Sequence, residues 1–375
     1  MIYLDSAATT LQKPLQVARA AARAIRTLSS PGRGGYSSAM DAAELSFSCR
    51  EEAASLFHVS DPEQVVFTFN ATHGLNIAIK TLVKPGSRVV ISGYEHNAVT
   101  RPLEAIPSVS LRIAHSHLFD QKGTVESFQR EIERGVDVVI CTHVSNVFGF
   151  ILPIEEIAAL CREQHVPLVV DASQSAGCIP IDAQALGASF VAMPGHKGLY
   201  GPQGTGLLLC GQQPEPLLHG GTGSESALQT MPAFLPDRLE AGTHNIPGIA
   251  GLLEGLRYLK RRGVEAIGRH ERALIQRAGK GLSALNGMQV FFCEEHGVQS
   301  GVLSFRTDRF DCEEFGQWLN EQGFALRAGL HCAPAAHRSA GTFETGTVRL
   351  SVSDFNTEHE IGQLIRLIAR RVGQG

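Results

Sequence analysis

Two stretches, Val166-Pro-Leu-Val-Val-Asp-Ala-Ser-Gln174 and Ala188-Ser-Phe-Val-Ala-Met-Pro-Gly-His-Lys197, decide the fold. Each is an apolar run of strand length that ends in polar residues. Near-continuous apolar runs of this kind are typical of strands buried on both faces of a parallel sheet. The carboxyl ends of such strands open into a common crevice in which ligands bind. We therefore expect Asp171 and Lys197 to face one site.

Outward from these stretches, apolar β-branched runs alternate with amphipathic ones through the first two-thirds of the chain. The expected strands are 65–69, 88–91, 110–114, 137–142, 168–170, 190–193 and 206–209. The expected helices between them are 17–28, 41–57, 72–82, 125–134 and 154–164. The alternation predicts an α/β fold with a mostly parallel seven-stranded sheet covered on both faces.

The remainder of the chain has a different pattern. Residues 211–247 are rich in Gly, Pro, Ser and Thr, and a loop of this length is usually functional. A helical segment over 249–285, broken near Gly263, precedes shorter strands and helices typical of an α+β domain. We expect a large domain over 15–248 and a small α+β domain from 1–14 and 249–375, with the site between them.

Composition excludes several classes of protein. The 375 residues are 43% hydrophobic and 19% charged, with a formal charge of -4, which argues against a nucleic-acid partner. The N-terminus lacks the features of a signal peptide, and no apolar run is long enough for a membrane span. The eight cysteines include no C-x-x-C pair, so we expect neither a disulfide framework nor a metal site. The predicted protein is cytoplasmic and does not bind membranes.

A lysine and a carboxylate at neighbouring strand ends suit pyridoxal 5'-phosphate (PLP), which forms a Schiff base with a lysine while an acid partners its pyridinium nitrogen. Polar residues also follow other expected strands, namely Thr72 with His73, then His96, then Asn146. Backbone N–H groups at a helix N-terminus bind phosphate. Taken singly, Thr72 also fits a helix cap, His96 a loop and Asn146 a turn. Their recurrence at successive strand ends predicts a cofactor site.

These residues, in this order, resemble the class V aminotransferase family of fold-type I PLP enzymes. The two most specific blocks are Asp171-Ala-Ser-Gln-Ser-Ala-Gly177 and Gly195-His-Lys-Gly-Leu-Tyr-Gly-Pro202. The opening Tyr3-Leu-Asp-Ser-Ala-Ala-Thr-Thr10 is also similar to the start of that family. The resemblance covers nearly the whole chain. It implies the fold-type I PLP-dependent transferase fold and a homodimer with a shared active site.

The resemblance also implies roles around the cofactor ring. Lys197 corresponds to the Schiff-base lysine and is catalytic. Asp171 keeps the pyridine nitrogen protonated, so that the ring withdraws electrons. Gln174 and Asn146 bind the phenolic oxygen. His96 stacks on the ring and also transfers protons.

Around the cofactor phosphate, the resemblance implies binding by Thr72 and His196, with His73 in the same cofactor-binding group. Thr243 matches the element by which the partner subunit completes the phosphate site in this family. Pro194 departs from the pattern, because the desulfurase members usually carry Ser there. One hydroxyl donor to the phosphate is therefore absent.

The segment Phe324-Ala-Leu-Arg-Ala-Gly-Leu-His-Cys-Ala-Pro334 resembles the active-cysteine segment of the group II cysteine desulfurases. The thiolate is the reactive form of a cysteine, and nearby cations favour it. Arg327 and His331 are expected to supply positive potential beside Cys332. A small buried core residue is the commoner fate of a cysteine, but the polar, glycine-containing setting favours a reactive thiol.

The strand around Arg349 matches the family strand whose arginine binds the substrate α-carboxylate, because a guanidinium holds a carboxylate bidentately. In isolation this arginine also fits a surface ion pair. Arg327 and Asn146 complete the expected substrate contacts.

The predicted activity is that of a cysteine desulfurase, which converts L-cysteine to L-alanine and leaves a persulfide on Cys332 for an unidentified sulfur-acceptor protein. The alternatives are a selenocysteine lyase acting on L-selenocysteine, another class V lyase or aminotransferase, and a non-catalytic dimeric scaffold.

Overall fold

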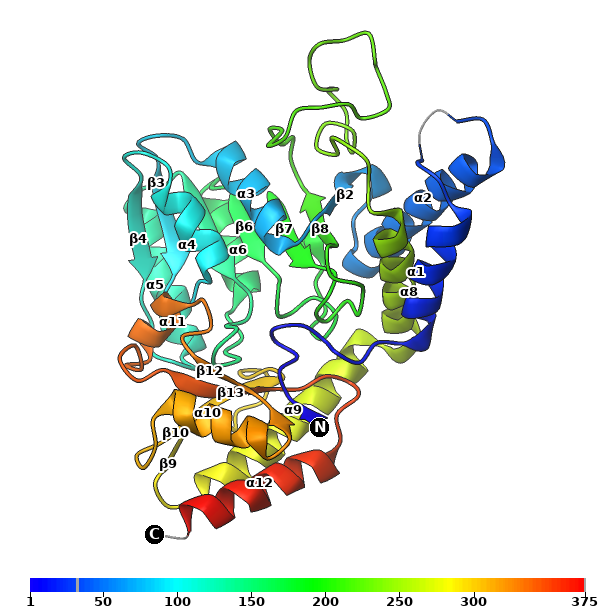
Figure 1. The fold of residues 1–375 in the computed structure, drawn as a ribbon. Helices are drawn as coiled ribbons and strands as arrows, with labels where there is room; N and C mark the ends of the chain where they lie inside the picture. Colours follow the sequence, from blue (N-terminus) through cyan, green and yellow to red (C-terminus); the bar gives the residue numbers. More distant parts are fainter. Residues whose placement is uncertain (32–33, 374–375) are drawn as a thin grey trace.

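The computed structural model describes residues 1–31 and 34–373, which form two lobes (Figure 1). The large lobe surrounds a central sheet, and the small lobe surrounds a second sheet near the two chain ends. Among the described helices, none combines the length and the apolar composition of a membrane span.

Within the described residues, the central sheet has seven strands in the order β2-β8-β7-β6-β5-β3-β4. Their bounds are β2 (Val65–Thr68), β3 (Arg88–Ser92), β4 (Ser110–Ala114), β5 (Val138–Thr142), β6 (Leu168–Asp171), β7 (Phe190–Pro194) and β8 (Gly206–Cys210). The run from β7 to β4 is parallel, whereas β8 is antiparallel to both of its neighbours. The predicted α/β fold with a mostly parallel seven-stranded sheet is confirmed.

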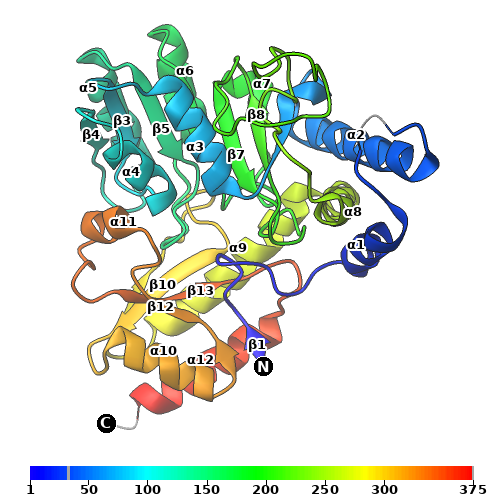
Figure 2. The same ribbon diagram turned by 45° about the horizontal axis from the view of Figure 1, so that its top comes forward.

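The helices of the large lobe cover both faces of this sheet (Figure 2). They are α1 (Leu15–Thr27), α2 (Ser37–Phe57), α3 (Ala71–Leu82), α4 (Asn97–Glu104), α5 (Gln121–Glu133), α6 (Ile154–Glu163), α7 (Ala183–Leu186) and α8 (Ile246–Arg262), with a 3-10 turn at Pro62–Gln64. Of these, α3 and α4 pack on one face, and α2, α5, α6 and α8 pack on the other. Both faces are therefore sealed from water, and the sheet opens only at its strand ends.

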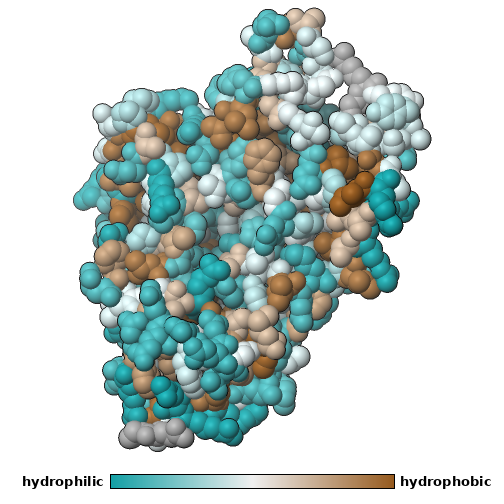
Figure 3. Space-filling model, viewed as in Figure 1, coloured by the Kyte–Doolittle hydropathy of each residue, from teal (hydrophilic) through white to brown (hydrophobic). Residues whose placement is uncertain are grey.

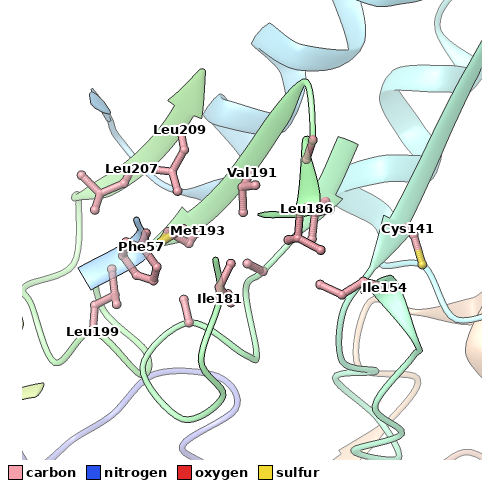
Figure 4. Packing of buried hydrophobic residues seen from close by; sticks show 14 of the residues in the cluster. Phe57, Cys141, Ile154, Ile181, Leu186, Val191, Met193, Leu199, Leu207 and Leu209 are labelled. Atoms are coloured by element: carbon pink, nitrogen blue, oxygen red, sulfur yellow. The ribbon is translucent and has the colours of Figure 1, made fainter. Parts of the chain in front are cut away.

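Alternation along each strand supplies the two cores. Val138 and Ile140 of β5 belong to the cluster under α3 and α4, whereas Val139 and Cys141 belong to the opposite cluster. Figure 4 shows this second cluster, where Val191 and Met193 of β7 point to the same side. The two-residue period of a strand thus gives a sheet that is apolar on both faces.

The small lobe contains a four-stranded antiparallel sheet of order β12-β13-β10-β9. Its elements are β9 (Met288–Phe291), β10 (Val302–Thr307), β12 (Arg327–Gly329), β13 (Thr347–Ser351), α9 (Val264–Ser283), α10 (Cys312–Glu321), α11 (Pro334–Ser339) and α12 (Glu358–Val372). The N-terminal strand β1 (Ile2–Tyr3) joins this lobe by pairing with β11 (Phe324–Ala325). The domain bounds 15–248 and 1–14 with 249–375 stay a prediction.

The segment between β8 and α8, residues 211–245, contains neither helix nor strand and projects from the large lobe (Figure 1). This agrees with the absence of periodicity in its sequence.

Candidate functional site

A cavity lies at the carboxyl ends of β3, β5, β6 and β7, at the edge of the sheet that the covering helices leave open. Its lining includes these residues singled out from the sequence: Thr72, His96, Asn146, Asp171, Gln174, His196 and Lys197. The strand ends therefore converge as a parallel sheet requires. Pro194 lines the same cavity. The roles of these residues stay predictions.

Lys197 follows β7 and is half-buried in the cavity wall. Burial lowers the pKa of Lys197 to about 8. The negative charge of Asp171 raises this pKa, whereas the positive charge of Arg349 lowers it further. No carboxylate lies within ion-pair distance of Lys197 in the described part of the chain. Near neutral pH a sizeable fraction of this amine is therefore unprotonated and able to act as a base or a nucleophile.

Asp171 is the last residue of β6 and only 2% exposed. Its Oδ1 accepts the Ser173 backbone N–H at 2.9 Å and also the Ser173 hydroxyl. Its Oδ2 has no hydrogen-bond partner among residues 1–31 and 34–373. The carboxylate is thus fixed by one oxygen while the other remains available to a ligand. Ser173 also lines the cavity, a residue that the sequence-based site did not include.

His96 caps α4, and its Nδ1 accepts the Ala98 backbone N–H at 3.0 Å. The ring proton therefore lies on Nε2. Burial lowers the pKa of His96, so the imidazole is neutral. The cap fixes the plane of this ring at the cavity wall.

Glu95, beside His96, is a further group that the sequence did not reveal. Its Oε1 accepts the Ser92 hydroxyl at 2.5 Å and the Thr142 backbone N–H at 2.7 Å, while the buried Oε2 has no partner among the described residues. Burial raises the pKa of Glu95 to about 8, and the charge of Asp171 adds to this. Glu95 is therefore largely protonated near neutral pH, and it joins the ends of β3 and β5.

The N-terminus of α3 also lines the cavity. Asn70 caps this helix by accepting the His73 backbone N–H at 2.9 Å, while Ala71 and Thr72 line the cavity. The first N–H groups of a helix have no partner within the helix, and they favour an anion. His196 is also present, but burial lowers its pKa to about 4, so it is a neutral hydrogen-bonding group rather than a cation.

The structure does not bring His73 or Thr243 into this cavity. Successive residues of a helix point about 100° apart, so His73 leaves the side on which Thr72 lies. Its ring instead stacks on Phe69, with centroids 4.6 Å apart, in a second pocket that Thr243 also lines. Thr243 is exposed there, as a residue acting across a subunit interface would be.

Cys332 is exposed on a short loop between β12 and α11. Its carbonyl accepts the Asn97 backbone N–H at 2.8 Å, and the His331 carbonyl accepts the Asn146 side-chain N–H at 2.8 Å. Asn146 lines the cavity, and Asn97 directly follows His96. The cysteine loop is therefore attached to the cavity wall at two points, although Cys332 itself does not line the cavity.

One expectation about this loop is wrong. Burial, together with the Arg349 charge, lowers the pKa of His331 well below its ordinary value. His331 is therefore neutral and supplies no positive charge beside Cys332. Arg327 is exposed but forms an ion pair with Asp5, at 3.1 Å between Nη2 and Oδ2. The positive potential near the thiol is accordingly smaller than the sequence suggested.

Arg349 lies on β13, directly opposite Arg327 on β12, and is 2% exposed. Its Nη2 donates to Asp5 Oδ1 at 2.7 Å and its Nη1 donates to the Asn146 carbonyl at 3.1 Å. Its Nε is buried and has no hydrogen-bond partner in the part of the chain that the structure describes. Asp5 thus holds two neighbouring guanidinium groups together. Arg349 uses one N–H of each Nη in these contacts, so its Nε–H and the second N–H of each Nη are left for a carboxylate.

Residues 5–13, the N-terminal strap, are hydrogen-bonded to residues that line the cavity. The Ala7 carbonyl accepts the Gln174 side-chain N–H at 3.0 Å. Lys13 Nζ donates to the His196 carbonyl at 3.3 Å and to Thr10 Oγ1 at 2.8 Å. The strap therefore links residues of β1 and the small lobe to the segment that carries Lys197.

The residues around the cavity fit PLP by their chemistry. Lys197 offers a partly unprotonated amine, Asp171 offers a carboxylate oxygen without a partner, and Ala71 and Thr72 offer helix N-terminal N–H groups. An aldehyde, a pyridinium nitrogen and a phosphate each have a counterpart among these groups.

Two curated relatives and one solved structure resemble the whole chain. The probable cysteine desulfurase of Methanothermobacter thermautotrophicus is 32% identical, over 100% of this chain and 95% of that protein. The probable cysteine desulfurase of Mycolicibacterium paratuberculosis is 31% identical over 100% of this chain, which spans 56% of that longer protein. The apo structure of the cysteine desulfurase from Thermococcus onnurineus NA1 has a TM-score of 0.91 and 28% identity, covering 99% of this chain and 94% of that one. Because the family model of aminotransferase class-V also matches residues 2–364, the chain belongs to that family.

Proposed function

We propose that this protein is a PLP-dependent cysteine desulfurase that converts L-cysteine to L-alanine and forms a persulfide on Cys332. Among the eight cysteines, all within the described residues, Cys332 alone is exposed, and its loop is bonded to the cavity wall through Asn97 and Asn146. This observation carries the proposal, because sulfur transfer needs a thiol beside the site that activates the substrate. The relatives described above are named cysteine desulfurases, which supports the same activity.

The class-V family is PLP-dependent, and Lys197, Asp171 and the N-terminus of α3 would hold the cofactor in this chain. Gln174 and Asn146 would contact its phenolic oxygen, and Thr243 of a second copy would reach its phosphate. When bound, PLP withdraws electrons from the substrate Cα.

The side chains of the site then have distinct tasks. Arg349 binds the substrate carboxylate bidentately through its free Nε–H and a neighbouring Nη N–H, which also orients the amino group toward Lys197. Lys197 accepts the proton from Cα and returns it later, with His96 as the second proton-carrying group. Arg327 and Asn146 border the place of the carboxylate.

Sulfur transfer is the task of Cys332. Its thiolate attacks the substrate sulfur, so that an S–S bond forms while the C–S bond breaks. The electron pair of the broken bond stays with the substrate carbon, which takes up a proton and becomes the methyl group of alanine. Because Cys332 is exposed, we infer that a separate acceptor protein removes the persulfide sulfur.

Product analysis tests the activity. The protein, loaded with PLP and incubated with L-cysteine, should release alanine and gain the mass of one sulfur atom on the peptide that contains Cys332. Release of pyruvate and ammonia would instead identify a lyase that eliminates sulfide. A parallel incubation with L-selenocysteine separates the desulfurase from a selenocysteine lyase, for which only the selenium substrate would give rapid alanine release.

Replacing Arg349 by lysine should raise the KM for L-cysteine by about 10- to 100-fold with a smaller effect on kcat, because lysine cannot form the bidentate contact. Steady-state alanine formation measures both constants. Arg338→Lys, on an exposed position of α11, is the matched control and should behave as the wild type. An unchanged KM in R349K would remove Arg349 from the substrate site.

We further propose a homodimer whose interface includes the exposed apolar side chains of α1, α2 and segment 211–245. These side chains are Leu15, Ile25, Met40, Phe47, Leu218, Leu228 and Phe234. Apolar side chains are visible over α1 and α2 on the face shown in Figure 3. Exposed Thr243 belongs to the same segment, so a second copy there would bring it toward a cavity. Sedimentation should give twice the chain mass, whereas a monomer would contradict the proposal.

A further inference from the structure

The backbone of the Cys332 loop is strained. His331 and Cys332 have φ angles of 51° and 54°, in the left-handed region that side chains other than glycine rarely occupy. Two such residues in succession persist only where the surrounding structure fixes them. Asn97 and Asn146 hold the loop from the large lobe, as described above. A second set of contacts holds it from the small lobe.

This second set is a chain of hydrogen bonds behind the loop. His331 Nε2 lies 3.1 Å from the Arg327 carbonyl oxygen, and His331 Nδ1 lies 3.5 Å from His337 Nε2. His337 Nδ1 lies 2.7 Å from Thr342 Oγ1. The two imidazole planes are within 12° of each other, which suits an edge-to-edge contact of two nitrogens. The chain thus runs from the hydroxyl of Thr342 to the backbone just before the cysteine loop.

The surroundings of the chain exclude water. His337 has no exposed surface and lies against Phe148, with ring centroids 5.7 Å apart, and His331 is 9% exposed. Burial lowers the pKa of His337 to about 4 and that of His331 well below its ordinary value. Each ring therefore carries a single N–H proton near neutral pH.

With one proton on each imidazole ring, the donor and the acceptor of each hydrogen bond in this chain are fixed. A carbonyl only accepts, so the proton of His331 must lie on Nε2, which donates to Arg327. Its Nδ1 is then a bare acceptor, which places the proton of His337 on Nε2. Nδ1 of His337 must in turn accept the proton of Thr342. The Thr342 hydroxyl also lies 3.5 Å from the His337 carbonyl oxygen, but the contact with Nδ1 is much shorter. Removing one member of this hydrogen-bond chain leaves a buried nitrogen without a partner.

We propose that His337 and Thr342 are positioning residues for Cys332, and that they hold the His331–Cys332 backbone in its left-handed conformation through this directed chain. The proposal rests on the proposed function, in which Cys332 is the nucleophile. Neither residue is among those that line the cavity. They act by fixing the tautomer and the orientation of His331. The His331 carbonyl accepts the Asn146 side-chain N–H, and the carbonyl of the next residue, Cys332, accepts the Asn97 backbone N–H.

A pair of substitutions at Thr342 tests the chain. Thr342→Val keeps the shape of the side chain but removes the donor to His337, whereas Thr342→Ser keeps a hydroxyl. In T342V we expect amide hydrogen exchange of residues 327–334 to accelerate at least about tenfold, and kcat for alanine formation to fall by about 10- to 100-fold. The serine variant should retain wild-type exchange and most of the activity. Thr345→Val, in the same turn but outside the chain, is the control.

A third readout separates positioning from general damage. Exchange of the Cα proton of L-alanine with deuterium uses Lys197 and the cofactor but not Cys332, so it should stay at the wild-type rate in T342V. Amide hydrogen exchange of residues 327–334 at the wild-type rate in T342V would overturn the proposal. An equal loss of Cα-proton exchange and of sulfur transfer would overturn it as well. Amide hydrogen exchange of residues 327–334 is measured without turnover, in protein with and without PLP. It therefore tests the hydrogen-bond chain even if Cys332 proves not to be the nucleophile.

Discussion

Replacing Cys332 by alanine should reduce alanine formation from L-cysteine by about a thousandfold or more, because the acceptor of the substrate sulfur is lost. The substrate still binds, since Arg349 and Lys197 are untouched. Cα-proton exchange of L-alanine should therefore continue at the wild-type rate. The measurement is alanine release per active site under single-turnover conditions, together with the mass of the intact protein.

Cys293→Ala is the matched control, because Cys293 is the next most exposed cysteine in the described residues but lies in the small lobe away from the cavity. It should desulfurate L-cysteine as the wild type does. Undiminished alanine formation in C332A would rule out the persulfide route. If L-selenocysteine alone remained a good substrate in C332A, a selenocysteine lyase would be the better description.

Replacing Lys197 by alanine should reduce the rates of both sulfur transfer and Cα-proton exchange by about a thousandfold or more. The amine of Lys197, with its pKa of about 8, lines the cavity and is able to move a proton at Cα. The two variants therefore differ in kind, since C332A loses one partial reaction and K197A loses both. Release of PLP on gel filtration adds a second readout, because the covalent attachment is also lost.

Lys80→Ala, on the exposed end of α3, controls for the loss of a lysine from the large lobe. A K197A protein that exchanged the Cα proton normally would contradict the role assigned to Lys197. Partial recovery of exchange on addition of a small primary amine would support it, since the amine would occupy the space of the missing side chain.

The sheet was predictable because its strands are continuous apolar runs. The strand expected at 110–114 has these bounds in the structure, and the others differ by one residue at an end. Helix α4 was not predicted, because it is short and contains Pro102, a residue that normally ends a helix. Helix α11 was missed for a similar reason, since Pro334 opens it and only six residues form it.

The candidate site was predictable where strand ends carry it, because parallel strands bring their carboxyl ends together. Asp5 was missed, since its contact with Arg349 joins residues 344 positions apart, and no local pattern marks such a pair. Glu95 was missed because a carboxyl beside a histidine looks like an ordinary loop residue until its burial is known. The charge of His331 was misjudged for the same reason, because burial sets it.

The pairing of Ile2 with Phe324 also affects the order of events during synthesis. Ile2 leaves the ribosome long before Phe324 does, and the loop between these two residues contains the whole central sheet. The central sheet, whose strands end at Cys210, is complete in sequence much earlier. The strap beside the site therefore takes its place after the central sheet, and an interrupted chain would display an unfinished site to the chaperones and proteases of the cell.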